Sequence, residues 1–167
     1  MNSFIRYLAY GSNMSLRRLR ARVPEAQPLG SAILHGHELR FHKRGRDGSG
    51  KCDAYCVNNE TAYLRGVLFD IPLAGKDDLD RIEGLGAGYH EKTVSVLREN
   101  GSREVAVTYY ATDIAENLLP YCWYKQHVLT GAMEFNFPKD YLASIEAVEM
   151  VADQDSRRKA RENALYV

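Results

Sequence analysis

The segment from Tyr89 to Thr112, YHEKTVSVLRENGSREVAVTYYAT, contains two runs in which apolar and polar side chains alternate. Asn100 and Gly101 lie between these runs. Alternation is the period of a β-strand, and an Asn-Gly pair favours a type I′ turn because both residues take positive φ at low cost. We therefore predict an antiparallel hairpin here, and any fold for the chain has to include it.

Shorter patterns on both sides of the hairpin predict further strands and helices. Strand-like runs come mostly before it and helical runs after it, with one short helix between, which indicates an α+β fold with a mixed or antiparallel sheet. Such a sheet can curl into a small barrel, but the strand pattern does not establish closure. Gly84, Gly86 and Gly88 are expected to end the short helix. The predicted strands cover 4–10, two pieces of 28–44 that bend at Gly36, 52–57 and 63–71, and the predicted helices cover 15–22, 74–83, 121–135 and 138–150.

No repeat or long linker divides the 167 residues, so a single domain is expected. We assign residues 1–150 to it and treat the charged segment 151–167 as a C-terminal helix or tail of the same domain. Lys plus Arg and Asp plus Glu number 22 each, a balance that gives no reason to expect nucleic acid or an anionic membrane as a partner. The one basic cluster is interpreted as the solvated face of a short helix; it consists of Arg17, Arg18, Arg20 and Arg22.

The sequence favours a cytoplasmic protein. No apolar run approaches the roughly 20 residues that a membrane helix needs, and the first residues, MNSFIRYLAYGSNM, lack the charged start and long apolar centre of a signal peptide. Three cysteines are an odd and sparse set, which suits a reducing compartment better than a disulfide framework. Cys52 and Cys56 are interpreted as ordinary buried thiols.

Two patterns that resemble ligand sites are set aside. GRDGSGKC, residues 45–52, nearly matches the phosphate-binding pattern G-x-x-x-x-G-K-[ST], but Cys52 replaces the hydroxyl and a strand is predicted to follow. A mobile hairpin loop is the better interpretation. His35 and His37 share one face of a strand while His42 points to the other, so no zinc site is expected. No G-x-S-x-G motif occurs, and in an enzyme of this sequence the nucleophile need not come from the protein.

The stretch AYGSNMS, residues 9–15, connects a predicted strand to a predicted helix through a turn over residues 10–13. Gly11 lets backbone N–H groups approach a ligand closely, and the positive end of the helix adds to a start that can hold an oxyanion or a carboxylate. The alternative is that Ser12 or Asn13 only caps the helix. Both interpretations can hold together, since a cap orders the donors that bind a ligand.

Two stretches together resemble the γ-glutamylcyclotransferase family. The first is YLAYGSNM, a strand that runs into Tyr-Gly-Ser-Asn, and the second is LDRIEGLGAGYHEKTVSV, a helix that ends in Glu-Gly before a glycine loop and a Tyr that begins a strand. RGVLFDI, YYAT and YKQHVLTGAME fall where the family has its strands and a late helix. The resemblance spans Tyr7 to Met150, and the fold it implies is a small, mixed but mostly antiparallel β-barrel flanked by helices.

The resemblance also implies a reaction. In this family the α-amine of a γ-glutamyl group attacks its own γ-carbonyl, which forms 5-oxoproline and releases the attached amine or amino acid. The substrate supplies the nucleophile, so no metal or organic cofactor is expected, and the expected partner is a small γ-glutamyl molecule. The oligomeric state, monomer or homodimer, is left open.

Glu83 is the residue that the resemblance assigns as general acid/base, because a bound ammonium has to lose a proton before it can attack. Its position supports this role, since the negative end of the helix dipole and its apolar and glycine neighbours give a carboxylate little stabilisation. The alternative is one more exposed acid on an acidic helix. Asp77, Asp78 and Asp80 are interpreted as plain surface charges. The resemblance further implies a substrate-binding wall of Tyr7, Tyr10, Gly11, Ser12, Asn13, Tyr89, Tyr109 and Tyr124.

One departure narrows the expected substrate. Glutathione-degrading relatives have Leu after Tyr-Gly-Ser, whereas this chain has Asn13, which favours the branch that acts on γ-glutamyl amino acids or γ-glutamylamines. Similar proteins also remove a γ-glutamyl cap from biosynthetic products, and the sequence does not separate the two roles. The rival hypothesis is a non-catalytic module that binds a γ-glutamyl-like or acidic small ligand without turning it over.

Overall fold

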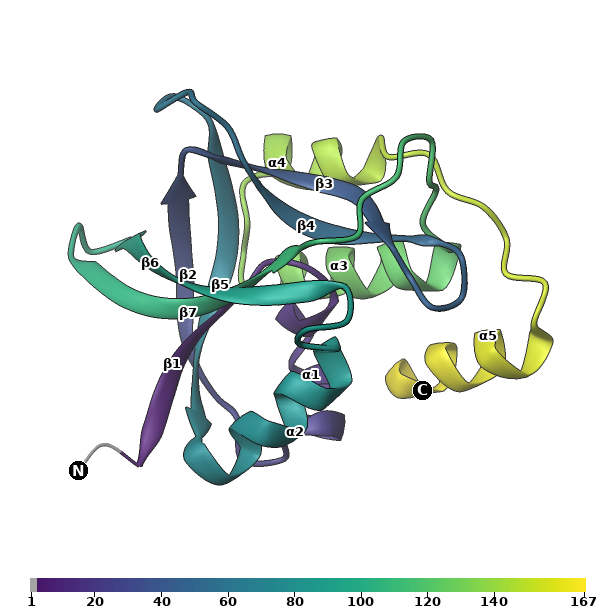
Figure 1. The fold of residues 1–167 in the computed structure, drawn as a ribbon, viewed down its shortest axis with the longest axis horizontal. Helices are drawn as coiled ribbons and strands as arrows, with labels where there is room; N and C mark the ends of the chain where they lie inside the picture. The colour runs from purple at the N-terminus through teal and green to yellow at the C-terminus, as the bar shows by residue number, and fades with distance from the viewer. Residues whose placement is uncertain (1–2) are drawn as a thin grey trace.

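A computed structural model describes residues 3–167. Within that range the chain forms a closed barrel of five strands, a separate two-stranded sheet and a set of helices packed around them (Figure 1). The elements are β1 (Phe4–Ala9), the 3₁₀ helix η1 (Ser12–Met14), α1 (Leu16–Arg22), β2 (Gln27–His35), β3 (His37–Arg44), β4 (Gly50–Cys56), β5 (Tyr63–Pro72), α2 (Leu73–Glu83), β6 (Tyr89–Arg98), β7 (Arg103–Ala111), α3 (Cys122–Glu134), α4 (Lys139–Glu146), α5 (Ser156–Asn163) and η2 (Ala164–Tyr166).

The barrel has the strand order β1-β5-β2-β6-β7, and β7 closes it against β1. Neighbouring strands are antiparallel except at the closing contact, where β1 and β7 run parallel and Tyr7 pairs with Val107. The α+β class and the mixed, mostly antiparallel barrel are confirmed. Closure depends on a pairing between strands about a hundred residues apart, which alternation within each strand does not encode.

The β6–β7 hairpin is confirmed, but its predicted turn type is wrong. The two strands pair from Tyr89 opposite Ala111 to Leu97 opposite Arg103. Gly101 has φ of 82°, whereas Asn100 is not among the residues with positive φ, so the turn is not type I′. The Asn100 side chain instead accepts hydrogen bonds from the N–H and the hydroxyl of Ser102, at 2.9 and 2.7 Å, and this local bonding fixes the loop.

The chain bends at Gly36 as predicted, and there it leaves the barrel. Beyond the bend β3 pairs with β4 in a sheet of its own. The loop between them is held by Asp47, which accepts from the Ser49 N–H at 3.0 Å and from the Lys51 ammonium at 2.9 Å. The near-match to a phosphate loop therefore lies between two strands, and no helix begins at its end.

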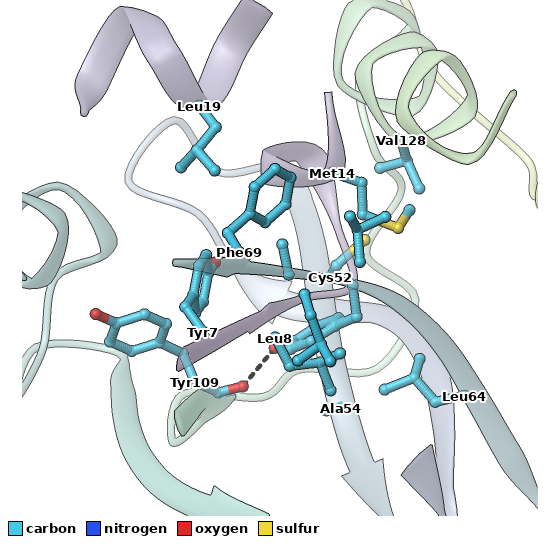
Figure 2. Close-up of a cluster of buried hydrophobic side chains, with 14 of the residues drawn as sticks. Tyr7, Leu8, Met14, Leu19, Cys52, Ala54, Leu64, Phe69, Tyr109 and Val128 are labelled. Carbon is cyan, nitrogen blue, oxygen red and sulfur yellow. Dashed lines mark hydrogen bonds between the residues drawn. The ribbon is translucent and has the colours of Figure 1, made fainter. Parts of the chain in front are cut away.

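The core fills the barrel and continues between the barrel and α3. Leu8, Leu64 and Phe69 belong to this core and are fully buried, and Figure 2 shows their side chains in one cluster with those of Met14 and Val128 from η1 and α3. In α3, a Cβ at Gly131 would lie 2.4 Å from the main chain of Met14, so only glycine allows this helix to lie directly on η1. The packing of α3 on η1 fixes the segment that carries the Tyr-Gly-Ser-Asn motif.

The two C-terminal helices, α4 and α5, both pack on α3, and α5 lies away from the strands of the barrel (Figure 1). The helix predicted over 138–150 ends earlier, because α4 stops at Glu146. The Lys125 ammonium donates to the carbonyls of Glu146 and Val148, at and just beyond the end of this helix. The charged segment after it forms α5, which reaches back to α1 through an ion pair of 2.6 Å between Glu162 and Arg18. No helix in residues 3–167 is both long enough and apolar enough to cross a bilayer.

Candidate active site

Between β1 and α1, where the sequence predicts a turn, the chain makes the 3₁₀ turn η1. Ser15 caps α1 by accepting from the Arg18 N–H at 3.4 Å, so the expected cap at Ser12 or Asn13 is wrong. The Leu16 N–H donates to Glu134 at 3.1 Å. The amides of Leu16 and Arg18 are therefore engaged within the protein and are not free to bind a ligand.

The main chain just before α1 offers donors instead. Within residues 3–167, the N–H groups of Gly11, Ser12 and Asn13 donate no hydrogen bond, while the carbonyls of Gly11 and Ser12 accept from Met14 and Ser15. Three successive amides are thus free on the wall of a pocket. Such amides can stabilise an oxyanion or a carboxylate.

Glu83 is the last residue of α2, and Gly84 ends the helix in the left-handed conformation with φ of 75°, as expected. The Glu83 carboxylate accepts from the Asn13 side-chain amide at 2.7 Å and pairs with Arg22 at 3.2 Å. Its side chain is 17% exposed. The sequence indicated surroundings that give this carboxylate little stabilisation, but α1 and η1 bring a cation and an amide donor to it.

Asn13 connects this carboxylate to the rest of the site. Its amide also lies 3.3 Å from the Tyr7 hydroxyl, and its carbonyl oxygen accepts from Arg22 at 3.0 Å. One side chain therefore holds a tyrosine, a carboxylate and a guanidinium in a fixed relation. The Asn in Tyr-Gly-Ser-Asn has a clear structural use.

All nine residues proposed from the sequence line one pocket, whose empty volume including its mouth is about 290 Å³. Two of the tyrosine hydroxyls are held by the main chain of Cys52: Tyr89 donates to its carbonyl at 2.6 Å, and Tyr124 accepts from its N–H at 3.0 Å. Tyr10 donates to the carbonyl of Tyr109 at 2.7 Å. The rings therefore form a rigid wall.

The site tyrosines are also held in their neutral form. Burial raises the pKa of Tyr7, Tyr10, Tyr89 and Tyr124 well above the ordinary value, and nearby acids add to the effect. For Tyr109, burial and its hydrogen bond to Asp80 raise the pKa in the same direction. Tyrosines of this kind serve as neutral hydrogen-bonding groups at neutral pH. Glu83 is the one carboxylic acid among the ten residues that line the pocket.

The packing of Gly11 adds a reason for glycine beside the close approach of a ligand that the sequence suggests. Its φ is −115°, which other residues also adopt, but a Cβ there would lie 2.8 Å from the Cβ of Cys52. Gly11 thus lets β4 approach η1, and Cys52 completes the pocket as its tenth lining residue. Burial raises the pKa of the Cys52 thiol to about 12, so it is not a nucleophile at neutral pH.

The pocket opens into a larger groove of about 1070 Å³. Four residues line both spaces: Ser12, Glu83, Tyr89 and Tyr124. Glu83 therefore lies at the junction and can be reached from either side. A ligand that filled the pocket and extended into the groove would pass this carboxylate.

Several residues near the site do not match their sequence-based interpretation. Arg18 is buried and Arg22 is partly buried, so only part of the basic cluster forms a solvated face. The Asp80 carboxylate accepts a hydrogen bond from the Tyr109 hydroxyl, so Asp80 is not a plain surface charge. Asp80 lies three residues before Glu83 on the same helix, and this spacing could have indicated that both side chains face the site. Cys56 is exposed, not buried, because β4 ends there. The contribution of Cys52 depends on how β4 docks, and no local pattern reports that.

Comparison with known proteins gives consistent results. A sequence model of the AIG2-like family matches residues 63–145. The γ-glutamylcyclotransferase of Homo sapiens is 27% identical over 149 residues, which cover 86% of this chain and 78% of that protein. The γ-glutamylcyclotransferase of Bos taurus is 24% identical over 146 residues with the same coverage. A solved structure of a γ-glutamyl cyclotransferase matches 96% of this chain and 99% of its own, with a TM-score of 0.85 and 22% identity, and shares the fold.

Proposed function

Because the chain belongs to the γ-glutamylcyclotransferase (AIG2-like) family, we propose that it releases 5-oxoproline from a γ-glutamyl amino acid or a γ-glutamylamine. The observation that carries this proposal is the position of Glu83, at the junction of the tyrosine-lined pocket and the groove. The pocket takes the γ-glutamyl group and the groove takes the amine that leaves. The scissile amide then lies beside the carboxylate.

Glu83 acts as the proton shuttle in this mechanism. The carboxylate removes a proton from the α-ammonium, and the resulting amine attacks the γ-carbonyl carbon to close the five-membered ring. The new C–N bond closes the ring and gives a tetrahedral intermediate, which collapses when the C–N bond to the leaving amine breaks. Glu83 passes the first proton to the leaving nitrogen, and the second proton that the ring nitrogen loses follows the same route, so one ammonium enters and one ammonium leaves. No external nucleophile is consumed.

The free amides of Gly11, Ser12 and Asn13 support the second requirement of the reaction. The tetrahedral intermediate carries a negative oxygen, and preorganised N–H groups stabilise such an oxygen with little reorganisation. These amides line the same pocket as Glu83, so one bound substrate can meet both groups. Asn13 and Arg22 are positioning residues here, because both contact Glu83 directly and fix its orientation.

A product assay tests the proposal. The purified protein is incubated with a panel of γ-glutamyl amino acids and γ-glutamylamines, and 5-oxoproline is measured by mass spectrometry against samples without protein. N-acetylated versions of the same compounds are the matched control, since their blocked amine cannot attack. We expect 5-oxoproline from free γ-glutamyl compounds alone. Calorimetric binding without product across the panel would instead support a non-catalytic binding module.

A further inference from the structure

The groove next to the pocket is strongly cationic, although the chain as a whole carries equal numbers of basic and acidic residues. Seven basic side chains line it against three carboxylates. A concave surface of one charge attracts ligands of the opposite charge. The seven basic residues are Arg18, Arg22, Lys43, Arg46, Lys51, Arg158 and Arg161.

Ion pairs within the protein already engage most of these cations. Arg18 and Arg161 reach Glu162, Arg22 reaches Glu83, Lys51 reaches Asp47, and Arg158 reaches Asp153. Lys43 and Arg46 are different, because neither side chain makes a hydrogen bond or an ion pair with any residue in the described range 3–167, although the main chain of Lys43 pairs within the β3–β4 sheet. These two cations remain for a ligand.

Lys43 is the more unusual of the two, since only 7% of the residue is exposed. Its ammonium lies 4.7 Å from the centre of the Tyr89 ring, and its end packs so closely on Gly88 that a Cβ there would be 2.9 Å away. Burial lowers the pKa of Lys43, the charge of Arg46 lowers it further, and Glu83, Asp113 and Asp47 act against both. The side chain of Lys43 is therefore largely buried while its charge has no bonded partner, which is unfavourable. The face of Tyr89 offsets only part of that cost.

Arg46 lies on the same side of the groove. One of its guanidinium nitrogens is 3.4 Å from the position that a Cβ at Gly84 would occupy. Lys43 and Arg46 therefore contact the two ends of the Gly84–Gly88 loop, directly after Glu83. Both lie where the leaving part of a substrate would pass the carboxylate and enter the groove.

We propose that this groove selects γ-glutamyl compounds whose leaving amine carries two or more negative charges, as an acidic amino acid does, and that Lys43 and Arg46 pair with those charges. The inference rests on the proposed function, since the leaving amine is defined by that reaction. The pairing satisfies the buried ammonium and adds a charge-assisted hydrogen bond to the substrate.

Two matched dipeptides test the selection. γ-Glutamyl-glutamate and γ-glutamyl-glutamine have nearly the same size and differ by one negative charge. We expect kcat/KM to be about tenfold higher or more for γ-glutamyl-glutamate, the difference that one charge-assisted hydrogen bond typically makes. The preference should fall with increasing salt. γ-Glutamyl-phosphoserine and γ-glutamyl-serine repeat the comparison with a phosphate and distinguish it from a carboxylate.

Two variants assign the preference to the two cations. Lys43→Met and Arg46→Gln should each reduce the ratio of the two kcat/KM values several-fold. Arg44→Gln is the matched control, because Arg44 neighbours both residues, is exposed and pairs with Asp113 outside the groove; its ratio should stay at the wild-type value. Melting temperatures show whether Lys43→Met is folded. If it is not, the kcat/KM ratio of Arg46→Gln tests the inference, because Arg46 is exposed and its substitution should not disturb the core.

Equal kcat/KM values for the two dipeptides would overturn the inference, as would a ratio unchanged in both variants. If no γ-glutamyl compound yields 5-oxoproline, the proposed function fails, and calorimetric titration of the same two dipeptides still decides the charge selection. Tighter binding of γ-glutamyl-glutamate that both variants weaken would support it, and equal binding would refute it.

Discussion

Glu83 carries both proton transfers in the proposed reaction, so Glu83→Gln is the sharpest substitution at the scale of one residue. Glutamine keeps the size of the side chain and can still accept from Asn13, but it cannot take the ammonium proton. We expect substrate binding to persist and 5-oxoproline release to fall by about 10²–10⁴-fold or more. The melting temperature should stay near the wild-type value, because relief from the helix dipole offsets the lost ion pair with Arg22. Turnover near the wild-type rate would exclude Glu83 as the shuttle.

Gly11 is a residue whose role depends on one close contact. A methyl group at this position lies 2.8 Å from the Cβ of Cys52, so Gly11→Ala has to push β4 away from η1. We expect weaker binding of a γ-glutamyl dipeptide, because Cys52 holds Tyr89 and Tyr124 in place, and a loss of about 1–3 kcal/mol in stability from overpacking. Calorimetry and thermal unfolding measure the two effects.

A second substitution checks that this contact is the cause. Cys52→Gly removes the opposing Cβ, so the double variant should recover part of the binding that Gly11→Ala loses. Additive losses in the double variant would show that the two residues act separately.

At the scale of elements, the chain's own patterns predict much of the secondary structure and little of its assembly. The alternation in 89–112 and the bend at Gly36 follow from local chemistry, and both were predicted. The Asn100 turn was not, because a side-chain bond to Ser102 outweighs the preference of Asn-Gly for two positive φ values. The site residues near Tyr-Gly-Ser-Asn came from a family resemblance, whereas Arg22, Lys43 and Cys52 enter the site only through docking of α1, β3 and β4.

The docking of α5 gives a prediction about an element. Although burial opposes it, bonds to His127 and the charge of Arg18 lower the pKa of Glu162 to about 2, from an ordinary value of 4.5. A lowered carboxyl pKa adds stability above pH 4.5, and this contribution is lost as the pH falls from there toward 2. Glu162→Gln should lower the melting temperature at neutral pH by several degrees, for a loss of about 2 kcal/mol. The difference in melting temperature between Glu162→Gln and the wild type should become smaller as the pH approaches 2.

Glu149→Gln is the matched control for this measurement, since Glu149 is exposed and makes no ion pair with any residue from 3 to 167. It should leave the melting temperature unchanged at every pH. A Glu162→Gln deficit that persists undiminished in acid would mean that packing of α5, and not the charge of Glu162, holds the helix against α1 and α3.

At the scale of the whole molecule, the five site tyrosines make the free energy of unfolding decrease as the pH becomes alkaline. Burial raises the pKa of each above the ordinary value of 10.0, so the folded protein keeps these protons when the unfolded chain has lost them. Stability therefore falls as the pH rises above 10.0, by about 1.4 kcal/mol per tyrosine for each pH unit. Five of them give a slope of about 7 kcal/mol per unit, comparable with the whole stability of a typical domain. The buried Lys43 and Lys51, whose pKa burial lowers, act in the opposite direction only up to 10.5.

We accordingly expect the protein to unfold cooperatively within about one to two pH units above 10. Tyrosinate absorbance of the site tyrosines should increase in the same step in which circular dichroism is lost, because burial raises the pKa of these hydroxyls as long as the protein is folded. Tyr7→Phe removes one of the five groups. The free energy of unfolding should then decrease less steeply with pH, while the decrease still begins near pH 10.0. Full ionisation of all tyrosines while the circular dichroism stays native would contradict the buried, rigid tyrosine wall on which both proposals depend.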